Sequence, residues 1–260
     1  SVFTEDIVKV VLGGPEVAAS LTASPCNHMC FTGGTDIGRK VMEAATKQLC
    51  SVTLELGGKS PVIVDKTANI KNAASKIAWG KYLNSGQVCI APDHMLVEKS
   101  LEKELVNKIK GRVTDMFGEH PLESEDLGKI VNQHHYDRIL SLIDDAVKMG
   151  AKLHIPGGVL EQGVDKRKIS PCILTDCTND MGIMQEEIFG PVLPVMSWTQ
   201  KEEVIDIISK NPHPLALYIF SSNSNNTDWF IENTTAGSTA VNEVIIQVAN
   251  CALPFGGIQT

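Results

Sequence analysis

The hydrophobic pattern of the chain alternates between a helical period and a strand period. Apolar residues recur at the three- and four-residue spacing of amphipathic helices at 68–83, 100–117 and 133–149. Short apolar or β-branched runs, which are typical of buried strands, lie at 62–64, 95–98, 192–198 and 216–222. Alternating strands and helices build a mostly parallel sheet, so the pattern predicts an α/β fold.

A further strand–turn–helix pattern lies before these segments. The stretch HMCFTGGTDIGRKVMEAA is a short strand, a turn at Gly33 and Gly34, and a helix from about Asp36. Glycines let backbone N–H groups approach a phosphate, and a helix N-terminus adds partial positive charge. A dinucleotide phosphate site and a tight turn without a ligand both fit this motif. The change to a longer series of elements predicts a domain boundary near Pro61.

Composition and charge narrow the class of protein. With 260 residues, 43% of them hydrophobic, the chain is long enough for one large core or two modest ones. A net charge of −8, with no basic cluster longer than DKRK, gives no surface for nucleic acid, so no nucleic-acid partner is expected. No apolar run reaches the length of a membrane span, because IFGPVLPVM is broken by Pro191 and Pro194.

The cysteines indicate a reducing compartment and no metal centre. Seven cysteines form an odd set without a CxxC pair, in a chain too large to depend on disulfides. Cys26, His28 and Cys30 would share one face of a strand, but a fourth ligand is missing and the neighbours are apolar. We therefore expect an intracellular, cytoplasmic protein with no metal site.

Two residues carry the chemistry that the sequence predicts. Glu55 lies in the strand VTLEL, between Leu54 and Leu56, which face the other way. A carboxylate bordering a cavity is a candidate general base, whereas a solvent-facing glutamate is the alternative. Cys89 follows 34 positions later in the loop NSGQVCIAP, where Pro92 blocks a new helix. A loop thiolate is a good nucleophile, whereas a small buried thiol is the alternative.

Two later stretches place polar residues in apolar surroundings. MQEEIFGPVLPV has Glu186 and Glu187 before a Gly-Pro turn, and STAVNEV has Asn242 and Glu243 after a strand. Taken singly, such residues fit turns and solvated charge.

Six motifs together resemble the aldehyde dehydrogenase superfamily, and most closely its class 3 or fatty-aldehyde branch. They are FTGGTDIG, TLELGGKSP, NSGQVCIAPD, QEEIFGPVLP, PLALYIFSS and LPFGG, in the order and spacing of that family. The resemblance implies the end of a Rossmann-like cofactor domain at 1–61, an α/β catalytic domain with a mostly parallel sheet at 62–255, and the start of a C-terminal segment at 256–260.

The resemblance also implies the site residues. Cys89 would attack an aldehyde to give a thiohemiacetal, hydride would pass to NAD or NADP, and water activated by Glu55 would hydrolyse the resulting thioester to the acid. Gly33 and Gly38 match phosphate-loop positions, and Gly34 stands where the family usually has serine. Glu187 and Phe189 match the residues that hold the nicotinamide ribose and ring. In the class 3 branch Glu187 is also a rival candidate for the base.

Some expectations concern the protein as a whole. Family members run to roughly 450 residues or more, well above the usual size of one domain, so the chain is expected to be a fragment that has little activity alone. The resemblance implies a small-molecule aldehyde substrate and a homodimer for the full-length form, and it leaves membrane anchoring of that form open.

Two alternatives to an aldehyde dehydrogenase remain. A CoA-acylating or phosphorylating relative would use the same cysteine with another acyl acceptor, and the presence of Glu55 favours water. A catalytically silent family fragment would keep the fold alone, and the presence of both Cys89 and Glu55 argues against it.

Overall fold

The computed structural model describes residues 2–161 and 166–258, and the chain divides into two compact units. Unit 1 is Ser1–Leu56 and unit 2 is Gly57–Thr260. This division lies a few residues before Pro61, the first residue of strand β3, Pro61–Val64, in the sheet of unit 2.

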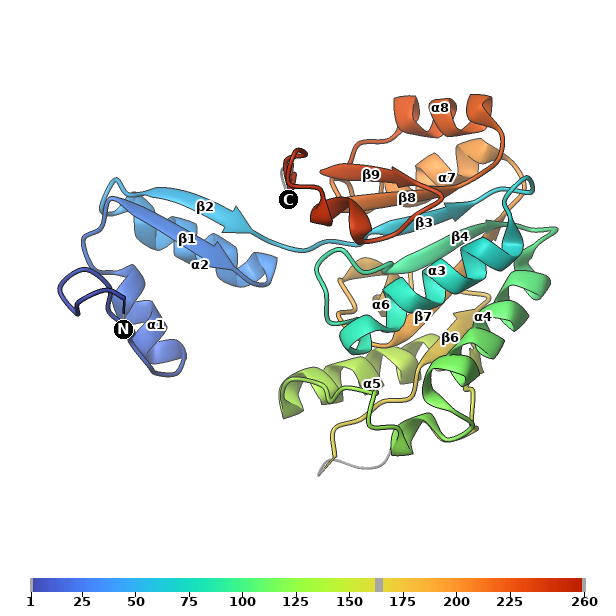
Figure 1. Ribbon diagram of the computed structural model, residues 1–260, viewed down its shortest axis with the longest axis horizontal. Coiled ribbons are helices and arrows are strands. Elements are labelled where there is room, and N and C mark those ends of the chain that lie inside the picture. Colours follow the sequence, from blue (N-terminus) through green and yellow to red (C-terminus); the bar gives the residue numbers. More distant parts are fainter. Residues whose placement is uncertain (1, 162–165, 259–260) are drawn as a thin grey trace. The chain divides into compact units, whose positions relative to one another are not determined.

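Unit 1 is a parallel strand pair with two helices. Strands β1, His28–Thr32, and β2, Ser51–Glu55, are joined by helix α2, Thr35–Thr46, and helix α1, Pro15–Thr22, precedes them (Figure 1). The expected strand–turn–helix pattern is therefore confirmed, while α1 was not predicted. The hydrophobic core is small, since the buried apolar side chains of the unit are Val41, Ala45 and Cys50.

Unit 2 is built on a seven-stranded sheet. All neighbouring strands in it run parallel except the antiparallel pair β5–β6, which confirms the mostly parallel α/β prediction. In spatial order the strands are β5 Lys152–His154, β6 Cys172–Thr175, β7 Val192–Trp198, β4 His94–Glu98, β3 Pro61–Val64, β8 Ala216–Phe220 and β9 Ser238–Val241.

Helices cover both faces of this sheet (Figure 1). Helices α3, Ile70–Tyr82, and α4, Glu102–Phe117, pack on one face in a core that includes Val62 and Val64. Ile63 points the other way, into a core with residues of the helices on the opposite face, as the two-residue strand period requires. The remaining helices are α5 Gln133–Lys148, α6 Gly182–Gln185, α7 Lys201–Ile208 and α8 Ser224–Asn233, with 3₁₀ turns η1 Leu83–Gly86, η2 Pro121–Glu123 and η3 Ile246–Ala249.

Side-chain caps fix where two of the predicted helices, α3 and α5, begin. The Asn69 side chain accepts a hydrogen bond from the backbone N–H of Asn72, and Asn132 does the same for His135. Helix α4 ends at Gly118, whose φ of 80° favours glycine. The three helices predicted from the hydrophobic period are confirmed, with starts shifted by at most two residues.

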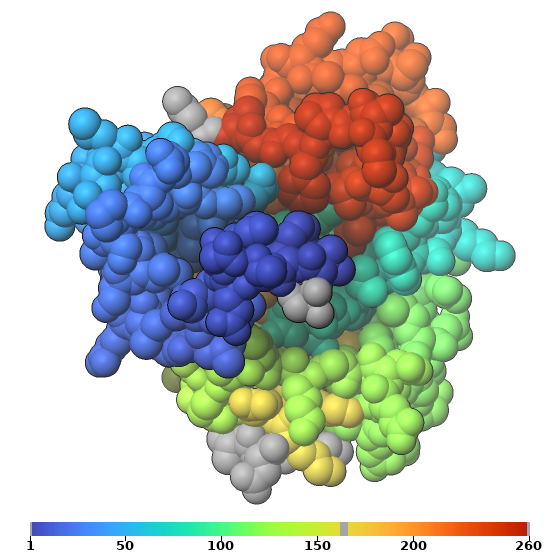
Figure 2. All heavy atoms as spheres, turned by 60° about the vertical axis from the view of Figure 1, so that its left-hand side comes forward, coloured from blue at the N-terminus to red at the C-terminus, as the bar shows by residue number. Residues whose placement is uncertain are grey.

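The last described residues lie on the surface of unit 2 (Figure 2). The backbone of Gly256 passes so close to Gly237 that a Cβ atom on Gly256 would lie 2.5 Å from the Gly237 carbonyl oxygen. Of the expected C-terminal segment 256–260, residues 259–260 lie outside the described residues. Within the described ranges, no helix has both the length and the apolar character of a membrane span.

Candidate active site

Cys89 lies in a tight turn between η1 and strand β4. Asn84 and Ser85 have positive φ angles of 49° and 55°, which redirect the chain after helix α3. The N–H of Ala91 donates to the carbonyl of Val88 at 2.9 Å and so closes a turn that holds Cys89. The Cys89 side chain is half-buried and packs against the core shared with α3. The loop position predicted for Cys89 is thus what the structure shows.

A buried tyrosine holds this turn from the sheet side. The Tyr218 hydroxyl donates to the carbonyl of Ile90 at 2.5 Å, and the Gln247 side-chain amide lies 3.4 Å from the same hydroxyl. Burial raises the pKa of Tyr218 to about 12, so this hydroxyl stays protonated and remains a donor at neutral pH.

A second loop carries Glu187 and Phe189, between helix α6 and strand β7. The Arg138 guanidinium donates to the carbonyls of Glu187 at 3.1 Å and Ile188 at 2.6 Å. Phe189 has a φ of 49°, which is uncommon for a bulky side chain and marks a conformation that the surrounding contacts impose. Both Glu187 and Phe189 are half-buried.

Buried charge ties the Glu187 loop to the chain that follows Cys89. Asp93 accepts a hydrogen bond from the N–H of Ile188 at 2.9 Å and pairs with the ammonium of Lys59. Lys59 also donates to the carbonyls of Ile183 at 2.8 Å and Glu186 at 2.9 Å. Burial alone would raise the pKa of Asp93, but Lys59 reverses that effect and holds the pKa well below its usual value.

Two glycines bring the same loops into backbone contact. A Cβ atom on Gly86 would lie 2.2 Å from the carbonyl oxygen of Gly190, and Gly86 has a φ of 74°. Gly86 and Asp93 lie on either side of Cys89 in the chain, while Gly190 and Ile188 lie on either side of Phe189. The Cys89 turn and the Glu187 loop are therefore fixed to each other at two points.

The Glu187 carboxylate sits in an environment suited to proton transfer. Burial, followed by the negative charge of Asp93, raises the pKa of Glu187 to about 7. The N–H of Gly58 and the charge of Lys59 act in the opposite direction. A Cβ atom on Gly57 would lie 2.2 Å from a carboxylate oxygen of Glu187, so a larger residue there would displace the carboxylate from this position. A glutamate with this pKa can exchange a proton near neutral pH.

The remaining predicted residues lie in unit 1. Gly33 donates its N–H to the carbonyl of Glu55 at 3.1 Å, so this group is used within the fold. A Cβ atom on Gly38 would lie 2.7 Å from the Leu56 side chain, which gives Gly38 a role in packing α2 on β2. Glu55 is the last residue of β2 and is half-buried. Its role, and the cofactor roles of Gly33 and Gly38, stay predictions.

Gly34 is exposed at the N-terminus of α2. It occupies the cap position with no side-chain cap, and a Cβ atom there would meet nothing within 4 Å. The first N–H groups of a helix have no partner within the helix and suit a phosphate. Gly34 and Glu55 belong to unit 1, whereas Cys89, Glu187 and Phe189 belong to unit 2.

Three polar residues of this site were missed by the reasoning from sequence. Lys59, Asp93 and Arg138 were each assigned no role, although they organise the two loops. The available signal was charge in apolar surroundings, because LGGKSPVIV and CIAPDHMLV place a lysine and an aspartate just before buried strands.

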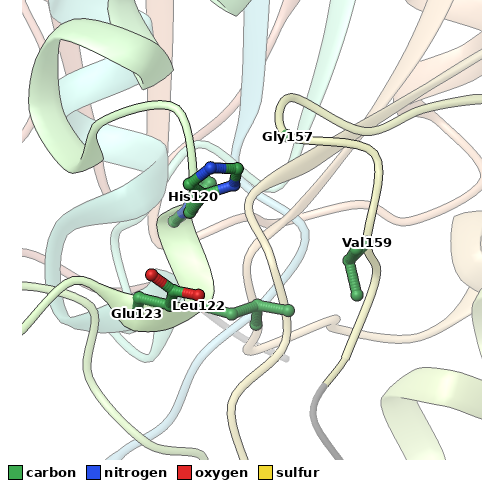
Figure 3. Close-up of a pocket in the computed structure, with 6 residues that line it drawn as sticks. His120, Leu122, Glu123, Gly157 and Val159 are labelled. Carbon is green, nitrogen blue, oxygen red and sulfur yellow. The ribbon is translucent and has the colours of Figure 1, made fainter.

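Two further features, a pocket next to η2 and the His28 face of β1, lie outside the residues of the candidate site. A pocket next to η2 is lined by His120, Pro121, Leu122, Glu123, Gly157 and Val159, and Leu122 points toward the loop that carries Val159 (Figure 3). His28 bonds to Ser51 and Thr53, rather than to the two cysteines of its strand face. In the described part of the chain, no group of three His, Cys, Asp or Glu residues is placed to hold a metal ion.

Comparisons with known proteins define the class to which this fold and site belong. The family model described as "Aldehyde dehydrogenase family" matches residues 2–260. The chain therefore belongs to the aldehyde dehydrogenase family.

Individual relatives agree with this assignment. "Aldehyde dehydrogenase family 3 member A2" of Rattus norvegicus is 43% identical over 254 residues, which cover 98% of this chain and 51% of that protein. "Aldehyde dehydrogenase, dimeric NADP-preferring" of Mus musculus is 41% identical over 254 residues, with 98% and 54% covered. The solved structure described as the substrate-bound state of Staphylococcus aureus AldH has a TM-score of 0.92 and 40% identity, covering 98% of this chain and 55% of that one. The chain spans about half the length of these relatives.

Proposed function

We propose that this chain carries the nucleophile and the nicotinamide-side residues of an NAD(P)-dependent aldehyde dehydrogenase. The observation that carries the proposal is the pair of loops fixed to each other through Asp93, one with Cys89 and the other with a glutamate of pKa about 7. Family membership supports the same reaction, the oxidation of an aldehyde to a carboxylic acid.

Cys89 is the nucleophile in this proposal. The thiolate sulfur attacks the carbonyl carbon of the aldehyde and forms a thiohemiacetal. NAD or NADP, when bound, accepts the hydride that leaves this carbon. The turn closed by Ala91 and held by Tyr218 keeps Cys89 at a fixed place, and such preorganisation is a large part of enzymatic rate enhancement.

Hydrolysis of the thioester requires a base that removes a proton from water. We assign that role to Glu55 on the strength of the family motif TLELGGKSP, and Glu187 is the rival candidate. The raised pKa of Glu187, about 7, suits either base catalysis or a bond to a ribose hydroxyl. Release of the acid then regenerates the Cys89 thiol.

The described residues fit a dinucleotide cofactor. In unit 1, the uncapped start of α2 at Gly34 offers backbone N–H groups for a phosphate. In unit 2, the match of the loop motif to the family supports Glu187 and Phe189 as contacts of the nicotinamide ribose and ring. Relatives include a protein named NADP-preferring and one described as NAD-dependent, so the class of cofactor is NAD or NADP. The relative named dimeric supports a homodimer as the full-length form.

The test uses the full-length protein that contains this chain. Replacing the nucleophile, Cys89→Ala, is expected to abolish NAD(P)H formation from an aldehyde and to leave cofactor binding largely unchanged. Cys251→Ala is the matched control, because Cys251 is an exposed cysteine of the same unit. Turnover of Cys89→Ala above about a hundredth of wild type would place the nucleophile elsewhere.

A second comparison decides the base. Glu55→Gln is expected to leave a rapid burst of NAD(P)H followed by a slow steady rate, because the thioester forms but is released slowly. If Glu187→Gln gives this pattern and Glu55→Gln does not, the base is Glu187. If the protein is instead a CoA-acylating enzyme, the wild-type protein will need an added thiol acceptor for steady turnover.

A further inference from the structure

Two cysteines of unit 1 lie in direct contact outside the proposed active site. The Sγ atoms of Cys26 and Cys50 are 2.8 Å apart, although 24 residues separate them in the chain. Cys26 lies just before β1 and Cys50 just before β2. Cys26 is exposed and Cys50 is buried, so the pair can be reached from solvent through Cys26.

The backbone around both residues holds them in this position. The N–H of Cys50 donates to the carbonyl of Ala45 at 3.1 Å, which folds the end of α2 back toward β2. The N–H of Ser51 donates to the carbonyl of Asn27 at 3.3 Å, so the residues that follow the two cysteines are themselves bonded. Little rearrangement is needed to bring the sulfur atoms from 2.8 Å to the bond length of about 2.05 Å.

We propose that Cys26 and Cys50 form a reversible disulfide, a modification site separate from the dehydrogenase chemistry. The oxidant is a low-molecular-weight disulfide such as oxidised glutathione. The Cys26 thiolate attacks one sulfur atom of glutathione disulfide, forming a mixed disulfide and releasing one glutathione thiolate, which takes up a proton. The Cys50 thiolate then attacks the Cys26 sulfur, and a second glutathione leaves. Two protein thiols are oxidised, and one glutathione disulfide is reduced to two thiols.

The environment of the pair sets the order of these steps. The hydrogen bond with Cys26, followed by burial, raises the pKa of the Cys50 thiol to about 11. The first attack therefore begins at the exposed Cys26. Cys30 offers a contrast, because it lies within β1, where its partner in the β1–β2 register is Thr53 rather than Cys50.

The bond would enclose the part of unit 1 that carries the predicted phosphate turn. The loop from Cys26 to Cys50 contains β1, Gly34 and the whole of α2. A disulfide restricts the open states of the segment that it closes. Oxidation is thus expected to slow amide hydrogen exchange between residues 28 and 46, a consequence that does not depend on whether the protein oxidises aldehydes.

The test is peptide mapping of the purified 260-residue protein after incubation with oxidised glutathione. Remaining thiols are alkylated, and trypsin then releases residues 10–39, with Cys26 and Cys30, and residues 48–59, with Cys50. We expect these two peptides to be joined, with the bond placed at Cys26 by fragment ions and lost after treatment with dithiothreitol.

Two matched variants separate this bond from nonspecific oxidation. Cys26→Ser is expected to lose the joined peptide and to leave glutathione on residues 48–59 or no modification there. Cys30→Ser, which changes a cysteine within β1, is expected to keep it. The proposal is overturned if the wild-type protein carries glutathione on these peptides without joining them, or if Cys26→Ser is joined as efficiently as the wild type.

Discussion

Glu187 shows how one side chain acquires unusual acidity from its neighbours. Arg138 and Asp93 hold the backbone of the loop, while the carboxylate itself is half-buried against Gly57 and Gly58. The backbone contacts determine where the carboxylate lies, and burial determines its proton affinity. A pair of adjacent glutamates usually lies in a solvent-exposed turn. A glutamate in that setting would have neither a fixed position nor a raised pKa.

The raised pKa of Glu187 predicts a pH dependence of stability. The pKa is about 7 in the folded chain and 4.5 for an ordinary glutamate, so between these values the folded state binds more protons than the unfolded state. Unfolding free energy contributed by this group therefore falls as pH rises from about 4.5 to about 7. Glu187→Gln should remove that decrease, measured by urea denaturation at several pH values.

The control for this measurement is the adjacent residue. Glu186 is exposed, and its carboxylate forms an ion pair with Arg138 at 3.5 Å. Glu186→Gln should leave the slope of stability against pH as in the wild type. Equal slopes in all three proteins would mean that Glu187 is not protonated near neutral pH in the folded chain.

Tyr218 is predicted to position Cys89 rather than only to stabilise the core. Tyr218→Phe removes the donor to the Ile90 carbonyl, at a cost of about 1–3 kcal/mol in unfolding free energy. Because Ile90 follows Cys89 directly, the turn loosens and exposes the half-buried Cys89 thiol, so alkylation of Cys89 by iodoacetamide should become faster by roughly threefold or more.

Tyr82 provides the matched control. It is equally buried, and its hydroxyl donates at 3.1 Å to the carbonyl of Cys172, in strand β6 rather than in the Cys89 turn. Tyr82→Phe should lower stability by a similar amount and leave the alkylation rate of Cys89 unchanged. If Cys89 is alkylated at similar rates in both variants, Tyr218 stabilises the core without positioning Cys89.

At the scale of elements, glycine contact between two loops assembles the proposed site. Gly86 ends η1 with a positive φ and touches Gly190 ahead of β7. Gly86→Ala would place a methyl group 2.2 Å from the Gly190 carbonyl oxygen. We expect a loss of about 2–4 kcal/mol in unfolding free energy, because backbone must move. Alkylation of Cys89 should become faster, because the half-buried thiol is then less well covered.

The contrast for this change is Gly111 in helix α4. A Cβ atom there meets nothing within 4 Å, and the residue is exposed in the middle of the helix. Gly111→Ala should raise the unfolding free energy by roughly 0.5–1 kcal/mol and leave the alkylation rate of Cys89 unchanged. If Gly86→Ala lowers the unfolding free energy by no more than an ordinary surface substitution does, the two loops are not in close contact.

The helices that could be predicted from sequence are those with a long regular pattern, whereas the short strands β3 and β4 were predicted from their continuous apolar runs. Helices α3, α4 and α5 run for 13 to 16 residues and repeat their apolar positions several times. Helix α7 has eight residues, with a capping box from Gln200 to Glu203, and its pattern was too short to detect. Strand β6 is as short as β3 and was not predicted. Local pattern cannot report a short element that only its neighbours stabilise.

The same limit applies to the site. Cys89 could be found because a loop between a helix and a strand is visible in the sequence, and because the family motifs surround it. The Lys59–Asp93 pair could not, since its partners are 34 residues apart and their bonds reach Ile183 in helix α6 and Ile188 in the loop after it. Pairing across that distance is set by the sheet order, which the hydrophobic pattern does not encode.

At the scale of the whole molecule, the two units differ in how much apolar surface each buries. In unit 1, strands β1 and β2 alternate between exposed and half-buried residues. In unit 2, strands β3 and β8 are buried at every position, and helices cover both faces of their sheet. Local opening needs less free energy where fewer apolar contacts are broken.

Amide hydrogen exchange of the reduced 260-residue chain should therefore show two classes of strand. We expect the amides of β1 and β2 to exchange at least about tenfold faster than those of β3 and β8, a difference of about 1.4 kcal/mol in opening free energy. Both strands of unit 1 are edges of a two-stranded sheet, so each leaves one side of its backbone without a ladder partner. Helix α2 should exchange with them, because Val41 and Ala45 on that helix supply most of the buried side chains of the unit. Equal protection in the two units would mean that unit 1 unfolds only together with unit 2.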